Sequence, residues 1–267
     1  MHPVFSFHRG TLPLLISVPH AGTHVPQDIL RRLTLAAQGL PDTDWFVDRL
    51  YAFAREMGAS MIVANYSRYV IDLNRSPDSQ PLYASDPTSP VCPTRTFGDE
   101  PIYMTGQEPE TSEVQRRLDE YWRPYHSELA RELAQMRAEH GAALLWDAHS
   151  VASEVPGLFA GVLPEFNFGT RDDLTCPRTF ADTLLDRITR EGKYGAVLNG
   201  RFKGGYITQN YGRPDDGCYA VQLELAQRVY LDERSPTTWD AQRCEAASIV
   251  IRDLLDTALR MIGQTRR

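Results

Sequence analysis

The chain has few cysteines, and they lie far apart. Its four cysteines never form a C-x-x-C pair; they are Cys92, Cys176, Cys218 and Cys244. This spacing argues against a cysteine-based structural zinc site and against a disulfide scaffold. Reduced thiols in a cytosol fit best, so the sequence predicts a cytoplasmic protein.

Long apolar runs and an excess of positive charge are also missing. No apolar run approaches about 18 residues, and the N-terminus lacks the basic start and apolar stretch of a signal peptide. The formal net charge is −7, whereas nucleic acids and anionic membrane surfaces are bound by basic patches. We therefore expect neither as a partner. A small anionic substrate needs only a few arginines gathered locally, and no feature indicates an oligomeric state.

Two common functional motifs are absent as well. The glycine-rich segment around Gly200, Gly204 and Gly205 matches neither a P-loop nor a dinucleotide-binding fingerprint. The chain contains no G-x-S-x-G nucleophile elbow. These absences disfavour nucleotide binding and serine hydrolase chemistry.

Hydrophobic residues make up 42% of the 267 residues, enough for a large core, and one domain over 1–267 is the default at this length. Apolar runs predict strands at 14–18, 61–64, 69–73, 144–147, 196–198 and 220–225. Helical patterns cover 44–57, 111–140 with a kink at Pro124, 180–191 and 239–262. Residues 76–110 carry seven prolines and are predicted to form a functional loop. The residues from the end of the strand at 144–147 to residue 170 are predicted to be irregular. The alternation predicts an α/β fold with three α/β/α layers and a central mixed, mainly parallel sheet.

Two of the predicted strands lead directly to a histidine. His20 follows the strand at 14–18, and His149 follows the strand at 144–147. Ligands of open α/β sheets lie outside the carboxyl ends of the strands, and neutral imidazole is a common zinc ligand. A single such histidine more often only caps a strand, but two together favour a catalytic site for a divalent metal, above all Zn²⁺.

A catalytic zinc ion typically has three protein ligands, so a third residue is needed. We predict Asp44, at the head of its helix, although an aspartate there is also a common helix cap. Asp42, Asp147 and His24 are the alternatives. His24 lies four residues after His20, a spacing that brings side chains together only on a helix, and the residues between them look like a loop.

Glu224 is the candidate general acid and base. It interrupts the apolar pattern of the strand at 220–225 on the face where Gln222 also points, so both side chains can look into a cleft. The alternative is an edge strand whose polar face lies in water.

An asparagine and an arginine end the strand predicted at 69–73. The planar guanidinium of Arg75 can bind a carboxylate through two parallel hydrogen bonds, while the amide of Asn74 fixes its orientation. Arg201 and Arg95 are candidates for a second carboxylate, although each alone is more often a solvated surface residue. The pattern predicts a small acidic substrate.

Taken together, these motifs resemble the N-formylglutamate amidohydrolase family over roughly residues 14–230. The segments that carry the resemblance are 18–24, 42–45, 71–75, 147–150, 200–208 and 222–225. The resemblance implies hydrolysis of N-formyl-L-glutamate to formate and L-glutamate, the last step of one route of histidine degradation.

The resemblance also implies kinship with zinc carboxypeptidases and aspartoacylase-like deacylases, and hence their phosphorylase/hydrolase-like fold. Those relatives have a zinc-binding carboxylate three residues after the first histidine, whereas this chain has Thr23 there. The role of the metal-binding carboxylate is therefore assigned to Asp44. The alternatives are a metal-dependent deacylase of another N-acyl amino acid or acidic peptide, and a non-catalytic protein that binds acidic ligands. Glu224 argues against the second, because a binder does not need a carboxylate beside the metal and an anion.

Overall fold

A mixed, mainly parallel sheet forms the centre of the computed structural model, which describes residues 2–80, 90–190 and 192–264. In the described chain its seven strands lie in the order β1-β3-β2-β4-β7-β5-β6. Pairings are parallel except those of β1 with β3 and of β5 with β7. The strands are β1 Phe5–His8, β2 Leu14–Val18, β3 Ser60–Ala64, β4 Ala143–Val151, β5 Phe166–Gly169, β6 Ala196–Leu198 and β7 Cys218–Ala226.

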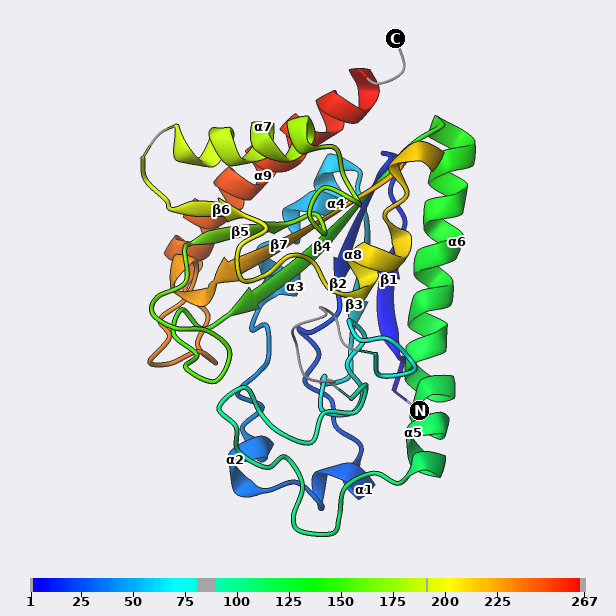
Figure 1. Ribbon diagram of the computed structural model, residues 1–267, viewed down its shortest axis with the longest axis vertical. Helices are drawn as coiled ribbons and strands as arrows, with labels where there is room; N and C mark the ends of the chain where they lie inside the picture. The colour runs from blue at the N-terminus through cyan, green and yellow to red at the C-terminus, as the bar shows by residue number, and fades with distance from the viewer. Residues whose placement is uncertain (1, 81–89, 191, 265–267) are drawn as a thin grey trace.

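Helices cover both faces of this sheet, which confirms the predicted α/β class and its layers (Figure 1). One face packs against α3 Val47–Leu50, α4 Phe53–Met57, α7 Arg178–Thr189 and α9 Ala241–Gln264. The other packs against α6 Arg123–His140 and α8 Tyr206–Tyr211. The strands alternate between the faces as expected for a sheet with two covered sides: Trp146 of β4 faces the first layer and Leu145 the second.

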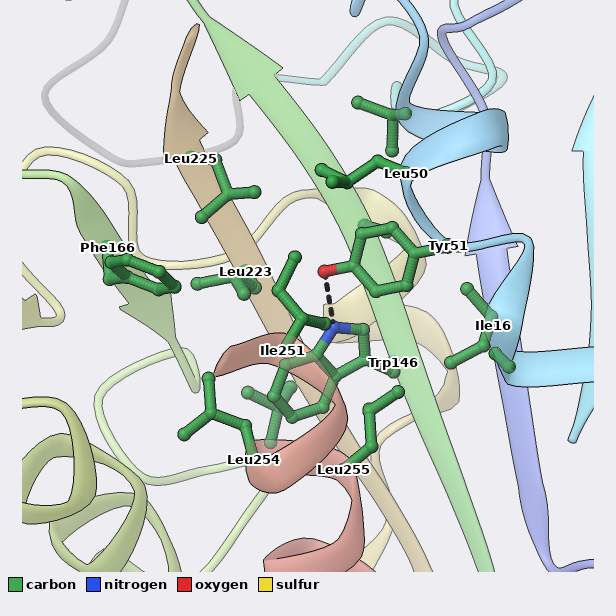
Figure 2. Close-up of a cluster of buried hydrophobic side chains, with 14 of the residues drawn as sticks. Ile16, Leu50, Tyr51, Trp146, Phe166, Leu223, Leu225, Ile251, Leu254 and Leu255 are labelled. Carbon is green, nitrogen blue, oxygen red and sulfur yellow. Dashed lines mark hydrogen bonds between the residues drawn. The ribbon is translucent and has the colours of Figure 1, made fainter. Parts of the chain in front are cut away.

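Trp146 lies at the centre of the core on the α9 side of the sheet (Figure 2). Its indole Nε1 donates a hydrogen bond to the hydroxyl of Tyr51 at 3.0 Å, so the polar group of this fully buried side chain is satisfied. Leu223, Leu254 and Leu255 belong to the same cluster.

Shorter elements lie beyond the sheet and in its connections. Helices α1 Gln27–Leu30 and α2 Leu35–Gln38 form a separate small core with Tyr69 and Val70. A π-helix, η1 Leu118–Trp122, joins α5 Thr111–Arg117 to α6, and two 3-10 turns are η2 Pro214–Asp216 and η3 Gln227–Val229. Pro124 lies in the first turn of α6. The helix predicted over 111–140 is confirmed as one continuous helical rod, the α5–α6 rod, whose regular α-helical pattern is interrupted by the π turn at 118–122. In the part of the chain described, no helix has both the length and the apolar character that crossing a membrane requires.

The prediction of a strand at 69–73 is wrong. The segment forms turns without strand pairing, because Tyr69 and Val70 pack into the small core with α1 and α2 instead of beside another strand. The carbonyl oxygens of Val70 and Leu73 accept hydrogen bonds from side chains of the α5–α6 rod. An apolar run shows that residues are buried but does not show what buries them.

The helix predicted from Asp44 is also different. It is split into α3 and α4, and the residue before α3 is Phe46 in the left-handed region, with a φ of 60°. The side chain of Asp44 does not cap α3, since it contacts β4. The strands β1 and β5 were not predicted, because in each of them phenylalanine alternates with other residues and no apolar run forms. Of the predicted loop at 76–110, residues 81–89 lie outside the described residues.

Candidate metal centre and substrate pocket

Three neighbouring parallel strands deliver polar side chains to one edge of the sheet. His20 lies two residues after β2, and the register of β4 with β7 pairs His149 with Glu224 and Asp147 with Gln222. Adjacent parallel strands end at the same edge, so residues about 130 and 200 positions apart in the sequence meet there. Ala143, Leu145, Asp147 and His149 share one face of β4 by alternation.

His20, Asp44 and His149 form a buried group whose ligand atoms lie within 4.8 Å of one another. Asp44 Oδ2 is 3.1 Å from Nδ1 of His149 and 3.8 Å from Nδ1 of His20. The backbone N–H of Asp44 donates to the carbonyl of His20, and that of Ser150 donates to Asp44 Oδ2, both at 3.1 Å. The group can hold a metal ion, and it contains the three residues predicted for that role.

Two further carboxylates orient the imidazole rings. Nε2 of His20 donates to Asp72 at 2.8 Å, and Nε2 of His149 lies 2.9 Å from Asp147. Each ring therefore directs Nδ1 toward Asp44. Nδ1 of His20 is buried and has no hydrogen-bond partner, although buried polar atoms are normally paired. Metal-bound histidines characteristically donate their other nitrogen to a carboxylate, so the donor set fits a divalent metal.

The alternative ligands occupy other places. Asp42 accepts hydrogen bonds from the hydroxyl of Tyr69 at 2.7 Å and the backbone N–H of Phe97 at 3.0 Å. Asp147 lies on the Nε2 side of His149 and accepts from the hydroxyl of Ser17. His24 is exposed, outside the pocket, with its ring 4.5 Å from that of His2. The geometry therefore brings Asp44, and not these residues, between the two histidines.

Arg68 is the main site residue that the sequence analysis missed. Its buried guanidinium donates to Asp72 at 2.7 Å and lies 3.7 Å from Asp44 and 4.6 Å from the ring centre of Phe97. Burial opposes ionisation of Asp72, but Arg68 and His20 outweigh it and hold the pKa of Asp72 well below its usual range. The only available signal was the spacing of four between Arg68 and Asp72, and Arg68 lies directly before the strand predicted at 69–73.

Neighbouring charges also determine the ionisation of Asp44 and His149. Burial opposes ionisation of Asp44, but the hydrogen bond with His149 and the charges around it lower the pKa of Asp44. Burial also opposes protonation of His149, yet Asp147 and Asp44 raise the pKa of His149 well above its usual value in the metal-free protein. Metal binding at Nδ1 must therefore displace a proton.

Glu224 lies beside this group and is buried. Burial raises the pKa of Glu224 to about 8 in the metal-free protein, against the opposing charge of His149. The side-chain amide of Gln222 donates to Glu224 at 3.2 Å. The carboxyl group of Glu224 is thus poised to exchange a proton near neutral pH.

A small cavity of about 90 Å³ opens onto the metal group. Asn74, Arg75 and Arg201 line it, as predicted, together with apolar side chains that include Phe97 and Phe202. Arg201 Nε donates to the carbonyl of Leu158 at 2.7 Å. Arg95 is not brought into this cavity; it lies on the exposed loop beyond it and pairs with Asp99. The cavity places cationic side chains beside a group that can hold a metal ion, and this combination suits a small anionic ligand.

The glycine-rich segment packs directly on Asn74. A Cβ atom on Gly205 would lie 2.3 Å from Asn74 Nδ2. Asn74 cannot easily move, since its side-chain oxygen accepts from the backbone N–H of Ile207 at 2.8 Å and its amide donates to Asp147. Glycine is needed here for close approach.

Gly205→Ala should therefore displace Asn74 and disturb the cavity. We expect a loss of about 1–3 kcal/mol in unfolding free energy from overpacking and a fall in turnover on the order of 10- to 100-fold from misplaced groups. Thermal unfolding and a rate assay measure the two effects. Gly39→Ala is the control, because its Cβ would meet its nearest atom at 3.7 Å. Equal behaviour of the two variants would contradict the packing argument.

Comparison with known proteins gives a consistent result. The family model described as N-formylglutamate amidohydrolase matches residues 12–231. N-formylglutamate deformylases of Pseudomonas aeruginosa and Pseudomonas putida are 49% and 47% identical to the chain over 97% of both sequences. A crystal structure of N-formylglutamate amidohydrolase from Ralstonia eutropha has a TM-score of 0.80 at 27% identity, covering 98% of each chain. A gene product of Agrobacterium tumefaciens shares the fold with a TM-score of 0.70 at 19% identity, covering 97% of this chain and 96% of its own.

Proposed function

Because this chain belongs to the N-formylglutamate amidohydrolase family, we propose that it hydrolyses the formamide bond of N-formyl-L-glutamate to formate and L-glutamate with the help of a bound zinc ion. The observation that carries the proposal is a buried His20–Asp44–His149 group that opens onto a cavity lined by Glu224 and three arginines. The place of the reaction in histidine degradation rests on the resemblance and stays a prediction.

His20, Asp44 and His149 are the proposed metal ligands. A zinc ion held by two imidazoles and a carboxylate acts as a Lewis acid and makes a water molecule more acidic. Asp72 and Asp147 keep the two imidazoles in the tautomer that leaves Nδ1 as the ligand atom. The permanently charged Arg68 lowers the pKa of Asp72. The pKa of Asp44 is lowered chiefly by His149 and His20, with a smaller contribution from Arg68, so both carboxylates stay ionised and the donor set is preserved.

Glu224 is the proposed general base and acid. Its carboxylate takes a proton from the water molecule that attacks the formyl carbon, forming the new C–O bond. The C–N bond then breaks, and Glu224 gives the same proton to the departing nitrogen, which leaves as the amine of L-glutamate. The register that pairs Glu224 with His149 supports this role, because it holds the carboxyl group at the metal.

Arg75 and Asn74 are the proposed partners of one substrate carboxylate, and Arg201 of the other. All three line the cavity. The amide of Asn74 has two N–H donors; its nitrogen donates to Asp147 at 3.3 Å and lies 3.1 Å from Nε2 of His149. Binding both carboxylates fixes the formamide relative to Glu224, and such positioning removes several kcal/mol from a barrier.

Arg75→Lys tests the proposed substrate. Lysine keeps the charge but cannot make two parallel hydrogen bonds to a carboxylate, so we expect kcat/KM on N-formyl-L-glutamate to fall by about 10- to 100-fold, as for a weakened hydrogen bond to a charged group. An N-formyl amino acid that lacks the side-chain carboxylate and one that lacks the α-carboxylate are assayed in parallel by formate release. One of them should be a poor substrate that both enzymes hydrolyse about equally.

Arg95→Lys is the matched control for this experiment. Arg95 is exposed and paired with Asp99 outside the cavity, so its variant should match the parent on every substrate. Equal losses in Arg75→Lys on all substrates would instead assign Arg75 to the fold. A parent enzyme that releases no formate from N-formyl-L-glutamate, yet acts on another acyl group, would overturn the proposed substrate.

A further inference from the structure

The backbone that carries Asn74 and Arg75 is held without a strand partner. The carbonyl oxygen of Leu73 accepts a hydrogen bond from His126 Nε2 at 2.8 Å. The carbonyl of Asn74 accepts from the N–H of Tyr206 at 3.3 Å, and that of Arg75 accepts from the indole Nε1 of Trp122 at 3.1 Å. Three consecutive carbonyl groups are therefore each satisfied by a donor from another element.

Two of these donors lie one turn apart on the same helical rod. Trp122 ends η1, His126 lies in α6, and their rings stack at 3.7 Å between centroids with an interplanar angle of 20°. Burial lowers the pKa of His126 to about 4, so the ring is neutral and has one N–H to donate. The carbonyl of Leu73 can only accept a hydrogen bond, so Nε2 carries the proton. Nδ1, which lies 3.0 Å from the hydroxyl of Tyr211, is then the unprotonated nitrogen.

The π-helix explains how the rod presents these donors together. Arg117, at the end of α5, donates to the carbonyl of Val70 at 2.9 Å. Residues five apart in a regular α-helix point about 140° away from each other. The wider π turn, with its i→i+5 spacing, brings Arg117 and Trp122 onto one face. Arg117, Trp122 and His126 thus face the same irregular segment, 70–75.

We propose that Trp122 and His126 are positioning residues for substrate recognition, which hold the backbone of residues 73–75 so that Arg75 meets the substrate carboxylate in a fixed place. The inference rests on the proposed function, since it assumes that Arg75 binds that carboxylate. A segment without strand pairing that lost these donors would be held less firmly and would need further ordering when substrate binds, and that ordering weakens binding. The two residues therefore act on affinity more than on the chemical step.

Trp122→Phe tests the proposal, because it keeps one aromatic ring at the stacked position while it removes the N–H donor together with the second ring of the indole. Losing one hydrogen bond of ordinary net strength corresponds to a rise in KM of about 3- to 10-fold, with kcat within about twofold of the parent. Hydrogen exchange read by mass spectrometry should show faster exchange in a peptide covering residues 72–76. Both measurements use the full-length, metal-loaded protein.

Trp146→Phe is the matched control. It also removes one indole hydrogen bond of a buried tryptophan, here the bond to Tyr51 on the face of the sheet opposite α6 (Figure 2). Trp146→Phe should therefore lower the unfolding temperature without changing KM or hydrogen exchange at 72–76. A KM in Trp122→Phe equal to that of Trp146→Phe overturns the proposal, even if exchange is faster. If the parent does not hydrolyse N-formyl-L-glutamate, the proposed function fails first. Hydrogen exchange at 72–76 then still tests whether Trp122 holds the backbone of residues 73–75. Unchanged exchange in Trp122→Phe would overturn that statement.

Discussion

Glu224→Gln should abolish most of the turnover while leaving the fold and the metal in place. Glutamine is nearly isosteric with glutamate but cannot accept the proton of the attacking water, so kcat is expected to fall on the order of 100-fold or more. Formate release measures the rate, and metal analysis of the purified variant should still find about one ion per chain. A variant within a few-fold of the parent would make Glu224 an ordinary strand residue.

The stability of the same variant separates lost chemistry from lost structure. The folded-state pKa of Glu224 is raised to about 8, above the value of an unfolded chain. The folded protein therefore binds this proton more tightly than the unfolded chain does. Its unfolding free energy falls as the pH rises from the pKa of the unfolded chain toward 8. Glutamine removes this cost, so the metal-free variant should unfold at the same temperature as the parent or higher at pH 8.

Glu132→Gln provides the control for Glu224→Gln. Glu132 is also a buried glutamate, and it accepts a hydrogen bond from Ser60 at 2.7 Å in a part of the sheet away from the cavity. Its variant should keep the parental kcat within about twofold, whatever it does to stability. Comparable losses of kcat in both glutamine variants would point to a general structural effect and against a base at position 224.

His20→Ala should lose the metal and the activity together. The substitution removes one of three proposed ligands, so the effect should exceed the roughly 10- to 100-fold loss typical of a residue that only orients a ligand. The metal content of the purified variant should fall well below one ion per chain, and chelation of the parent should produce the same inactive state. Full turnover of a metal-free His20→Ala protein would end the metal hypothesis.

His24→Ala is the matched control, because it removes a histidine from the same post-strand segment four residues later. His24 is exposed and contacts the rings of His2 and Tyr66 instead of the metal group. Its variant should retain parental metal content and rate. A loss equal to that of His20→Ala would mean that the loop as a whole, and not the His20 ligand atom, is required.

The order of residues along the chain was enough to predict the features that depend on local structure. Apolar runs of strand length ending at His20 and His149 fixed which residues reach the edge of the sheet, because the side-chain period of a strand is built into the chain. The same alternation separated Glu224 from the apolar face of β7. Pro124 lies in the first turn of α6, and Gly141 caps its end with a φ of 71°, because the backbone preferences of proline and glycine act at their own positions.

The surroundings of those residues, by contrast, depend on how distant elements pack against one another. Asp72 reaches His20 across 52 positions and Trp122 reaches Arg75 across 47, and neither contact leaves a periodic signal in the sequence. The apolar run at 69–73 was predicted as a strand, yet side chains of the helical rod hold its backbone. Periodicity reports that a segment is buried, whereas the identity of its hydrogen-bond partners depends on which distant elements pack beside it.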